Sequence, residues 1–330
     1  NYPGKTYWLG SEETFKIDEE VHCSLDDFER CLESNERLPV VWIDTLKDER
    51  RPLEKVKAGK TRVFAAGQMD YIILFRQYFL GFIADTMERR IDNEVGVGIN
   101  PEGPDWQKLA LHLTKYSDNV IAGDFSNYDG SLSAQVLKLV LDLVNEWYDD
   151  EFSNHRSLIF EEICHSVHIN GSNLYQWTHS QPSGNPFTAV LNSIANMIYN
   201  RVCFYALTEN TPLAGQNFES YVSMIAYGDD NVLGVHPEAH EYFNCANLTR
   251  AMSDFGMTYT DEKKTGMIND FRRLDQVSFL KRSFVLRNAL WRAPLELEVI
   301  LESLNWIRGP NNDKLSLEQN LQTQLENLAC

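Results

Sequence analysis

The chain has 330 residues, 43% of them hydrophobic, and a formal net charge of −18. This length allows one large domain or two ordinary ones, and the acidic balance excludes a general nucleic-acid coat. The first residues do not have the pattern of a signal peptide, no apolar run is long enough to span a membrane, and the six scattered cysteines fit a reducing compartment. Because the chain opens without Met, we expect it to be a piece of a longer polypeptide.

Basic residues gather in residues 47–62, which we call the basic segment. Its cations are Lys47, Arg50, Arg51, Lys55, Lys57, Lys60 and Arg62. Alternation in 55–57 and again in 60–64 predicts strands with the cations on one side. A charge run of this kind is typical of a solvated face, but in so acidic a chain it is also the segment best suited to phosphates.

Helices and one short strand are predicted in the middle of the chain. Apolar and aromatic residues recur at helical spacing over 69–91, which predicts a buried helix, and 104–115 returns to this period. Residues 119–125 predict a strand that ends at an acid, Asp124. A loop over 181–186 opens a long helix that carries Thr188, Asn192 and Asn196 near one face.

Two apolar runs around Gly228-Asp229-Asp230 predict a β-hairpin with acids at its tip. Adjacent carboxylates on a turn repel each other, and a cation or exposure to water usually relieves this repulsion. Beyond the hairpin we expect a helix near 237–255, a strand and turn over 258–264, a strand pair near 278–284, and helices over 295–306 and 315–328.

The order strand, helices, hairpin, helix, strand is that of a split βαβ core, in which the first strand lies beside the hairpin. Such a core would bring Asp124 next to Asp229 and Asp230. Three carboxylates from two strand ends suit two hard divalent cations, Mg²⁺ or Mn²⁺. A pair of such ions can bind the attacking and leaving oxygens of an in-line phosphoryl transfer.

A set of short motifs resembles motifs A to E of viral RNA-dependent RNA polymerases of the picornavirus-like group. In chain order they are Asp124-x4-Asp129, Ser183-Gly184-x3-Thr188-x3-Asn192, Tyr227-Gly228-Asp229-Asp230-Asn231, Lys263 and Phe279-Leu280-Lys281-Arg282. The basic segment is similar to motif F. The sequence of residues 123–132 looks most like that of polymerases from picorna-like viruses of arthropods or marine hosts, of the dicistrovirus or iflavirus type.

The resemblance implies an α+β fold: a right-hand polymerase with an RRM/ferredoxin-like palm, partial fingers and a partial thumb. The implied division is part of the fingers over 1–118 with motif F over 47–66, palm motif A over 119–150, a fingers insertion over 151–182, palm motifs B, C and D over 183–275, motif E over 276–290, and part of the thumb over 291–330. Both ends of the polymerase are therefore expected to be truncated.

The resemblance also implies the roles of single residues. Asp124 and Asp229 would bridge both metal ions, with Asp230 coordinating more weakly. Lys263 would be the general acid for pyrophosphate, with the adjacent Lys264 as the alternative. The implied nucleotide-binding residues are Lys47, Lys55, Lys60, Arg62, Asp129, Ser183, Gly184, Thr188 and Asn192. Of these, Asp129 and Asn192 with Ser183 and Thr188 would recognise the ribose 2′-hydroxyl, and Gly184 would allow the loop to move over the nascent base pair. The primer grip would consist of Phe279, Leu280, Lys281 and Arg282.

The implied partners are an RNA template and primer, NTPs, a small protein primer and other viral replication proteins. The expected location is the host cytoplasm, at membrane-associated replication complexes, as part of a larger polyprotein. The alternatives are a reverse transcriptase, a catalytically inactive palm-fold RNA-binding domain, and a two-metal nucleotide cyclase-like enzyme. Asp129 and Asn192 argue against the first, the three intact aspartates against the second, and the primer-grip sequence against the third.

Overall fold

The computed structural model describes residues 4–11, 13–262, 271–306 and 314–329. The chain forms two compact units: unit 1 consists of Asn1–Asp85 and Asp129–Leu191, and unit 2 of Thr86–Tyr128 and Asn192–Cys330. The chain changes unit within α4 (Met69–Glu88), α6 (Tyr128–Ser131) and α9 (Thr188–Thr208).

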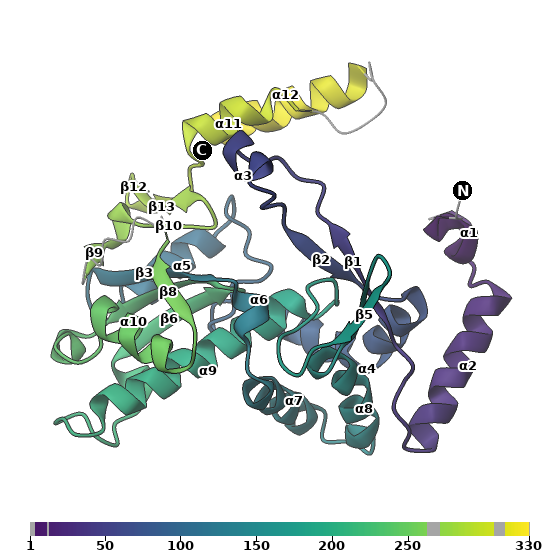
Figure 1. Ribbon diagram of the computed structural model, residues 1–330. Helices are drawn as coiled ribbons and strands as arrows, with labels where there is room; N and C mark the ends of the chain where they lie inside the picture. Colours follow the sequence, from purple (N-terminus) through teal and green to yellow (C-terminus); the bar gives the residue numbers. More distant parts are fainter. Residues whose placement is uncertain (1–3, 12, 263–270, 307–313, 330) are drawn as a thin grey trace. The chain divides into compact units, whose positions relative to one another are not determined.

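Unit 1 contains a four-stranded sheet with the order β2-β1-β4-β5 (Figure 1). Its strands are β1 (Trp42–Leu46), β2 (Val63–Ala66), β4 (Val167–Asn170) and β5 (Asn173–Gln176). Its helices include α1 (Lys5–Leu9), α2 (Glu19–Glu33), α3 (Leu53–Lys57), α7 (Ala134–Tyr148) and α8 (Ser153–Cys164). Strand β1 is antiparallel to β2 and parallel to β4, so the β1–β2 pair holds the two ends of the basic segment together.

Aromatic side chains form the core of unit 1. The rings of Phe75 and Phe79 in α4 stack with centroids 4.2 Å apart, and Phe187 packs against both. Trp42 of β1 is fully buried beside them in the same unit. The predicted buried helix in this region is confirmed as α4, because its aromatic residues recur at helical spacing.

Unit 2 contains the larger sheet and most of the C-terminal elements. Its strands are β3 (Asn119–Ser126), β6 (Val222–Tyr227), β7 (Asp230–Val235), β8 (Thr258–Asp261), β9 (Arg272–Arg273), β10 (Ser278–Phe279), β11 (Arg282–Ser283), β12 (Val285–Arg287) and β13 (Leu290–Arg292). Its helices include α5 (Asp105–Leu113), α10 (Cys245–Asp254), α11 (Leu297–Ser303) and α12 (Lys314–Ala329), with short 3-10 turns η1 (Phe218–Ser220), η2 (Pro237–Ala239) and η3 (Leu274–Gln276). The division into fingers, palm and thumb stays a prediction.

The main sheet of unit 2 has the strand order β6-β7-β3-β8, and β9 also pairs with β3. All of these pairs are antiparallel. Along the chain β3 is followed by helices, the β6–β7 hairpin, α10 and β8, which is a split βαβ arrangement. The prediction that the first strand lies beside the hairpin is therefore confirmed.

Alternation along β3 separates two faces of this sheet. Val120 and Ala122 join a buried cluster with Trp106 of α5, which packs against β6 and β7. Because successive side chains point to opposite faces, Phe125 lies on the other face, where its ring contacts Tyr259 of β8 at 4.9 Å between centroids. The strand is buried along almost its whole length, as expected for a central strand covered on both faces.

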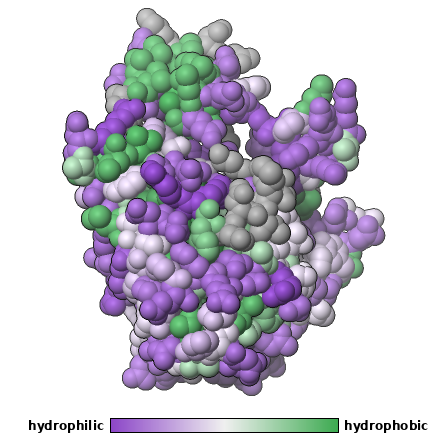
Figure 2. Space-filling model, turned by 90° about the vertical axis from the view of Figure 1, so that its left-hand side faces the viewer, coloured by the Kyte–Doolittle hydropathy of each residue, from purple (hydrophilic) through white to green (hydrophobic). Residues whose placement is uncertain are grey.

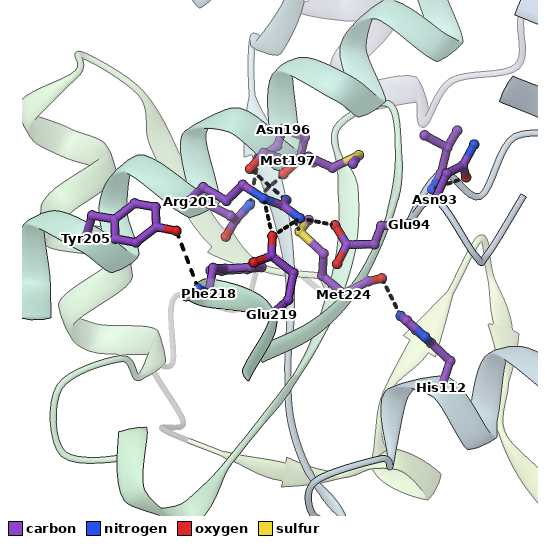
Figure 3. Close-up of polar contacts among 12 residues, drawn as sticks. Asn93, Glu94, His112, Asn196, Met197, Arg201, Tyr205, Phe218, Glu219 and Met224 are labelled. Carbon is purple, nitrogen blue, oxygen red and sulfur yellow. Dashed lines mark hydrogen bonds and ion pairs between the residues drawn. The ribbon is translucent and has the colours of Figure 1, made fainter. Parts of the chain in front are cut away.

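A polar cluster ties α9 to the loop before α5 and to η1 (Figure 3). Arg201 lies between two carboxylates, with its Nη2 2.6 Å from Glu94 Oε2 and 2.9 Å from Glu219 Oε1. Its guanidinium also lies over the ring of Phe218, 4.6 Å from the centroid. Burial raises the pKa of Glu94 although Arg201 opposes this shift. Removing Arg201 would therefore leave a buried carboxylate without its main ion-pair partner.

One predicted helix is shorter in the structure. The region predicted as a helix over 237–255 consists of η2 and the separate helix α10. Helix α10 begins at Cys245 because the side chain of Asn244 accepts a hydrogen bond from the Asn247 N–H, 2.9 Å away. Such an N-cap satisfies a backbone donor that no helical carbonyl can reach, so the new helix starts there.

The C-terminal helices α11 and α12 pack against each other and confirm the helices predicted at this end. Both leave leucines exposed: Leu297, Leu301, Leu317, Leu321 and Leu325. Figure 2 shows a hydrophobic area at the top of the view, where Figure 1 has these two helices. Even so, none of the helices in the described part of the chain is long and apolar enough to cross a membrane.

Candidate active site

The β6–β7 hairpin carries the Gly-Asp-Asp sequence at its tip. Tyr227 and Asp230 are its last paired residues, so Gly228 and Asp229 form a two-residue turn. Gly228 has a φ of 63°, in the left-handed region that such turns use and that glycine adopts without steric cost. The predicted hairpin with acids at its tip is confirmed.

Asp124 lies near the end of β3, the strand beside this hairpin. Strands β3 and β7 pair antiparallel, with Gly123 opposite Asn231. Continuing the register by one residue sets Asp124 opposite Asp230, with both side chains on one face of the sheet. Asp124 is 8% exposed, whereas Asp229 and Asp230 are partly exposed. The sheet thus brings the predicted metal-binding residues to one place, while their role as ligands stays a prediction.

These carboxylates have the donor chemistry that hard divalent ions prefer. Mg²⁺ usually combines one or two carboxylates with water and substrate phosphates, in place of a complete cage of protein ligands. Among the residues that the structure describes, no group of three or more His, Cys, Asp or Glu side chains forms such a cage.

Helix α9 supplies hydrogen bonds to the backbone of the turn. The Gly228 N–H donates to the Ser193 hydroxyl over 2.8 Å. The side-chain amide of Asn196 lies 3.0 Å from the carbonyl oxygen of Gly228 and 3.3 Å from that of Asp229. Both helix residues are fully buried. Sequence reasoning assigned them no function, and the available signal was a polar face on an otherwise apolar helix.

Asn192, predicted to recognise the ribose 2′-OH, lies one helical turn before Asn196 and on the same side of α9. It is 5% exposed, and its backbone carbonyl accepts a hydrogen bond from the Tyr128 hydroxyl at 3.1 Å. Tyr128 lies two residues after the end of β3, so this contact fixes the helix close to the end of that strand.

The other predicted ribose-binding residues lie in unit 1, around the loop before α9. Gln181 donates from Nε2 to Asp129 Oδ1 over 2.7 Å. The Thr188 hydroxyl lies 3.1 Å from the Ser183 carbonyl oxygen and 3.4 Å from Gln181 Oε1. Gln181, which sequence reasoning missed, therefore connects the predicted residues within this unit. Its place in the predicted loop was the signal for it.

Gly184 packs against the backbone of β2 in the same unit. A Cβ added at Gly184 would lie only 1.9 Å from the carbonyl oxygen of Ala65. Glycine is needed here for the close approach of two backbone segments. The loop predicted to close over the nucleotide thus contacts β2, the strand that follows the basic segment. The movement of this loop stays a prediction.

The basic segment continues the β1–β2 pair as an exposed connection. The Lys47 N–H donates to the Arg62 carbonyl over 2.9 Å, and Lys55 and Lys60 are exposed. The predicted strand over 55–57 is wrong, because these residues lie in helix α3. Three alternating residues are too few to distinguish a strand from a helical turn. The predicted row of cations on one side of a strand is therefore also wrong.

Glu49 partly neutralises the cations of the basic segment. The guanidinium of Arg62 pairs with both carboxylate oxygens of Glu49, and its Nε lies 2.7 Å from Oε1. Arg51 Nε lies 3.3 Å from the same oxygen. The hydrogen bond from Arg62 lowers the pKa of Glu49. The acid is therefore ionised near neutral pH and competes with any phosphate for these arginines.

The predicted primer grip is a tight turn in unit 2. Phe279 is buried, with its ring 6.5 Å from that of Trp106. It pairs with Arg282, so Leu280 and Lys281 form the two-residue turn between β10 and β11. Both turn residues have positive φ, 53° and 61°, as in the type I′ turns that join twisted strands. The strand pair predicted near 278–284 is confirmed, and its contact with a primer stays a prediction.

A hollow of about 430 Å³ links this turn to the Gly-Asp-Asp hairpin. Its walls include Tyr227 from β6 together with Leu280 and Arg282. Arg282 is fixed there because its Nη1 donates to the Ala293 carbonyl over 2.7 Å. Unit 2 thus places the predicted primer grip next to the hairpin that carries Asp229 and Asp230.

Lys263, the predicted general acid, lies outside the described residues. Strand β8, which precedes it, pairs with β3 and ends at Asp261. Glu262 then accepts a hydrogen bond from Arg272 Nη1 over 2.8 Å. The position of β8 next to Asp124's strand is compatible with the predicted role of the lysine, which stays a prediction.

Comparisons with known proteins agree with this geometry. The family described as "Viral RNA-dependent RNA polymerase" matches residues 12–330. The chain is 41% identical over 337 residues to the replicase polyprotein of Acute bee paralysis virus, covering 98% of this chain and 18% of the polyprotein. It is also 41% identical over 341 residues to that of Cricket paralysis virus, covering 97% and 19%. The chain thus spans about one fifth of these relatives' length.

A solved structure confirms the α+β polymerase fold. The Sicinivirus 3Dpol RNA dependent RNA polymerase aligns with a TM-score of 0.73 at 21% sequence identity, covering 97% of this chain and 68% of that one. The bee and cricket virus relatives also confirm the predicted likeness to picorna-like viruses of arthropods. Because the family match extends over nearly the whole sequence, the chain belongs to the viral RNA-dependent RNA polymerase family.

Proposed function

We propose that this chain catalyses RNA-templated RNA synthesis, transferring nucleotides from NTPs to the 3′-hydroxyl of an RNA primer and releasing pyrophosphate. Family membership supports the proposal. The observation that carries it is the register of β3 and β7, which sets Asp124 beside the Gly228-Asp229 turn. Carboxylates at adjacent strand ends suit phosphoryl transfer assisted by divalent ions.

The proposed site holds two Mg²⁺ ions. Asp124 and Asp229 would each bind both ions, and Asp230 would be a weaker ligand. Viral polymerases of this family generally use divalent metal ions, and this donor set suits Mg²⁺ or Mn²⁺. When bound, such ions would stabilise negative charge on the transferred phosphoryl group and on the leaving pyrophosphate. The protein contributes orientation, since Asp124 is buried in a central strand and α9 holds the backbone of the turn.

Preference for NTPs over dNTPs is assigned to Asp129, Ser183, Thr188 and Asn192. A 2′-hydroxyl both donates and accepts hydrogen bonds, so its recognition requires an acceptor and a donor. The Asp129 carboxylate is an acceptor that Gln181 orients, and the Asn192 amide can donate. Removing these contacts should weaken discrimination between ribose and deoxyribose more than it weakens nucleotide binding.

The remaining predicted residues are proposed to handle phosphates and the primer. Lys47, Lys55, Lys60 and Arg62 would contact the triphosphate, and Gly184 would permit the loop to close over the nascent pair. Lys263 would protonate the leaving pyrophosphate. Phe279 and Leu280 would shape the primer grip, whose cations Lys281 and Arg282 would hold the primer backbone.

The names of the relatives, which are replicase polyproteins, support the proposed partners. We propose that this chain acts as part of, or after release from, a larger viral polyprotein. It would copy the positive-strand genome with other viral replication proteins at membrane-associated complexes in the host cytoplasm. A small protein primer would supply a hydroxyl in place of an RNA primer.

Primer extension on an RNA template with Mg²⁺ tests the proposal. We expect extension with NTPs and much weaker extension with dNTPs, and none when Mg²⁺ is chelated. Preferential use of dNTPs would indicate a reverse transcriptase. RNA binding without extension would indicate an inactive palm-fold domain.

A further inference from the structure

Behind the Gly-Asp-Asp turn lies a chain of buried hydrogen bonds that reaches across the sheet of unit 2. The Tyr259 hydroxyl on β8 donates to Asn231 Oδ1 on β7 over 2.8 Å. Asn231 Nδ2 donates to Asn196 Oδ1 on α9 over 3.3 Å. Asn196 Nδ2 in turn lies 3.0 Å from the Gly228 carbonyl oxygen. The side chains of all three linking residues are buried.

Gly123 makes this chain of contacts possible. Strand β3 lies between β7 and β8, and Gly123 is opposite both Asn231 and Asp261. A Cβ on Gly123 would lie 1.9 Å from the Tyr259 hydroxyl oxygen and 2.0 Å from the ring. The tyrosine therefore crosses β3 above a residue without a side chain to reach the next strand. Gly123 is also the residue directly before Asp124.

The chemistry of the groups fixes the direction of these hydrogen bonds. A carboxamide donates only through nitrogen and accepts only through oxygen. With Tyr259 donating to Asn231, the Asn231 nitrogen is directed at Asn196, and the Asn196 nitrogen at the carbonyls of the turn. Burial raises the pKa of Tyr259 well above its ordinary value, so its hydroxyl remains a donor.

We propose that Tyr259, Asn231 and Asn196 form a relay that positions the Gly228-Asp229 turn, and with it the metal-binding carboxylates of the proposed polymerase reaction. Tyr259 and the two asparagines are positioning residues, since they hold the backbone of the turn and do not reach the substrate. The effect of this relay on catalysis rests on the proposed function. Its support of the turn does not.

The relay connects the three regions that the proposed reaction needs in register. β3 carries Asp124, β7 begins at Asp230, and β8 precedes Lys263. Backbone pairing already joins the strands, but the turn itself lies beyond the last ladder pair, Tyr227 with Asp230. Buried side-chain hydrogen bonds from α9 reach this unpaired segment. Loss of the Tyr259 hydroxyl, the first donor of the relay, should therefore loosen the turn while the sheet stays intact.

The test substitutes Tyr259→Phe, which removes one hydroxyl and keeps the ring. Tyr71→Phe is the matched control: Tyr71 is also fully buried, and its hydroxyl donates to the Ile159 carbonyl over 2.9 Å in unit 1. Two properties are measured in each variant and the parent chain. One is hydrogen exchange of the peptide that contains residues 227–231, and the other is the Mg²⁺ concentration for half-maximal primer extension.

We expect Tyr259→Phe to accelerate exchange of the turn peptide roughly twofold to tenfold and to raise the half-maximal Mg²⁺ concentration by a similar factor, as expected for one lost buried hydrogen bond. Tyr71→Phe should change neither property. Gly123→Ala, whose Cβ must displace the tyrosine ring, should act in the same direction as Tyr259→Phe.

Equal exchange in Tyr259→Phe and the parent chain overturns the relay, as does an equal increase in the Tyr71→Phe control. If the parent chain extends no primer but Tyr259→Phe still accelerates exchange of the turn peptide, the relay is supported and the proposed function is rejected. The two proposals therefore fail through different measurements.

Discussion

The Gly228-Asp229 turn of unit 2 and the basic segment of unit 1 both carry charged residues with predicted roles, but they are supported differently. The turn is held by buried side chains of α9, including Ser193 and Asn196. The basic segment is largely exposed, and its residues Arg51 and Arg62 pair with Glu49 from the same segment.

This difference matches the demands of the two roles. Metal ligands must hold nearly fixed positions, so a buried polar network that fixes the backbone is useful despite the desolvation of its groups. Cations that attract a triphosphate act over a longer range and can adjust to the ligand. Buried support is therefore found where the proposed contact requires fixed geometry, and exposed charge where it does not.

The largest expected effect is on the turn itself. Asp229→Asn should lower nucleotide incorporation by at least about 100-fold, since removing a direct ligand should cost at least as much as removing an outer partner of a metal site. Folding should be little affected, because the change also removes carboxylate repulsion. The measurement is primer extension together with chemical denaturation. Asp254→Asn, at an exposed position ending α10, is the control. Undiminished extension by Asp229→Asn would contradict the assignment.

The second prediction compares the same substitution at a buried ion pair of unit 2 and at an exposed ion pair of the basic segment. Arg201→Met leaves Glu94 buried without its main partner and should destabilise the protein by about 2–4 kcal/mol. Arg62→Met breaks an exposed pair with Glu49 and should shift the melting midpoint by less than about 2 °C. Thermal and denaturant unfolding measure both variants. Equal losses of stability would remove the contrast between buried support and exposed charge.

Gly184→Ala should have the next largest effect. The new Cβ would collide with the carbonyl oxygen of Ala65, so the loop or β2 must shift, at a cost of about 1–3 kcal/mol. Gly4→Ala is the control, because a Cβ at Gly4 meets no atom within 4 Å. Denaturant unfolding and the KM for NTPs report the effect. An unchanged stability would show that the two backbone segments are not packed as described.

The smallest effect concerns competition for the cations. Glu49→Gln should lower the KM for NTPs by about twofold to fivefold, since it frees Arg51 and Arg62 from a surface ion pair of modest strength. Arg62→Gln should raise this KM. Steady-state kinetics at low and high salt measure both, and the effects should shrink as salt rises. A higher KM for Glu49→Gln would mean that the pair positions Arg62 for the nucleotide.

Much of unit 2's sheet could be predicted because its signals are local. Apolar runs around two turn residues indicate a hairpin, and the order of elements then places residues 119–125 beside it. The juxtaposition of Asp124 with Asp229 and Asp230 followed from topology and from the motifs together. The three-residue alternation at 55–57 misled because so short a pattern fits a helical turn equally well.

The support behind the turn could not be predicted, because it depends on which strands become neighbours. Tyr259 and Asn231 are 28 positions apart, and their contact requires Gly123 between them. In the sequence Asn196 is simply a polar residue on a helix, and its partners are backbone carbonyls far along the chain. Gln181 was missed for the same reason, since its role is to orient Asp129.

Anomalous diffraction from crystals of this chain with Mn²⁺, an RNA primer–template and an NTP tests the central claim most directly. The account predicts a manganese peak at about 2.0–2.6 Å from carboxylate oxygens of both Asp124 and Asp229, lost in Asp229→Asn. Manganese bound elsewhere, with no peak between these two side chains, would contradict it.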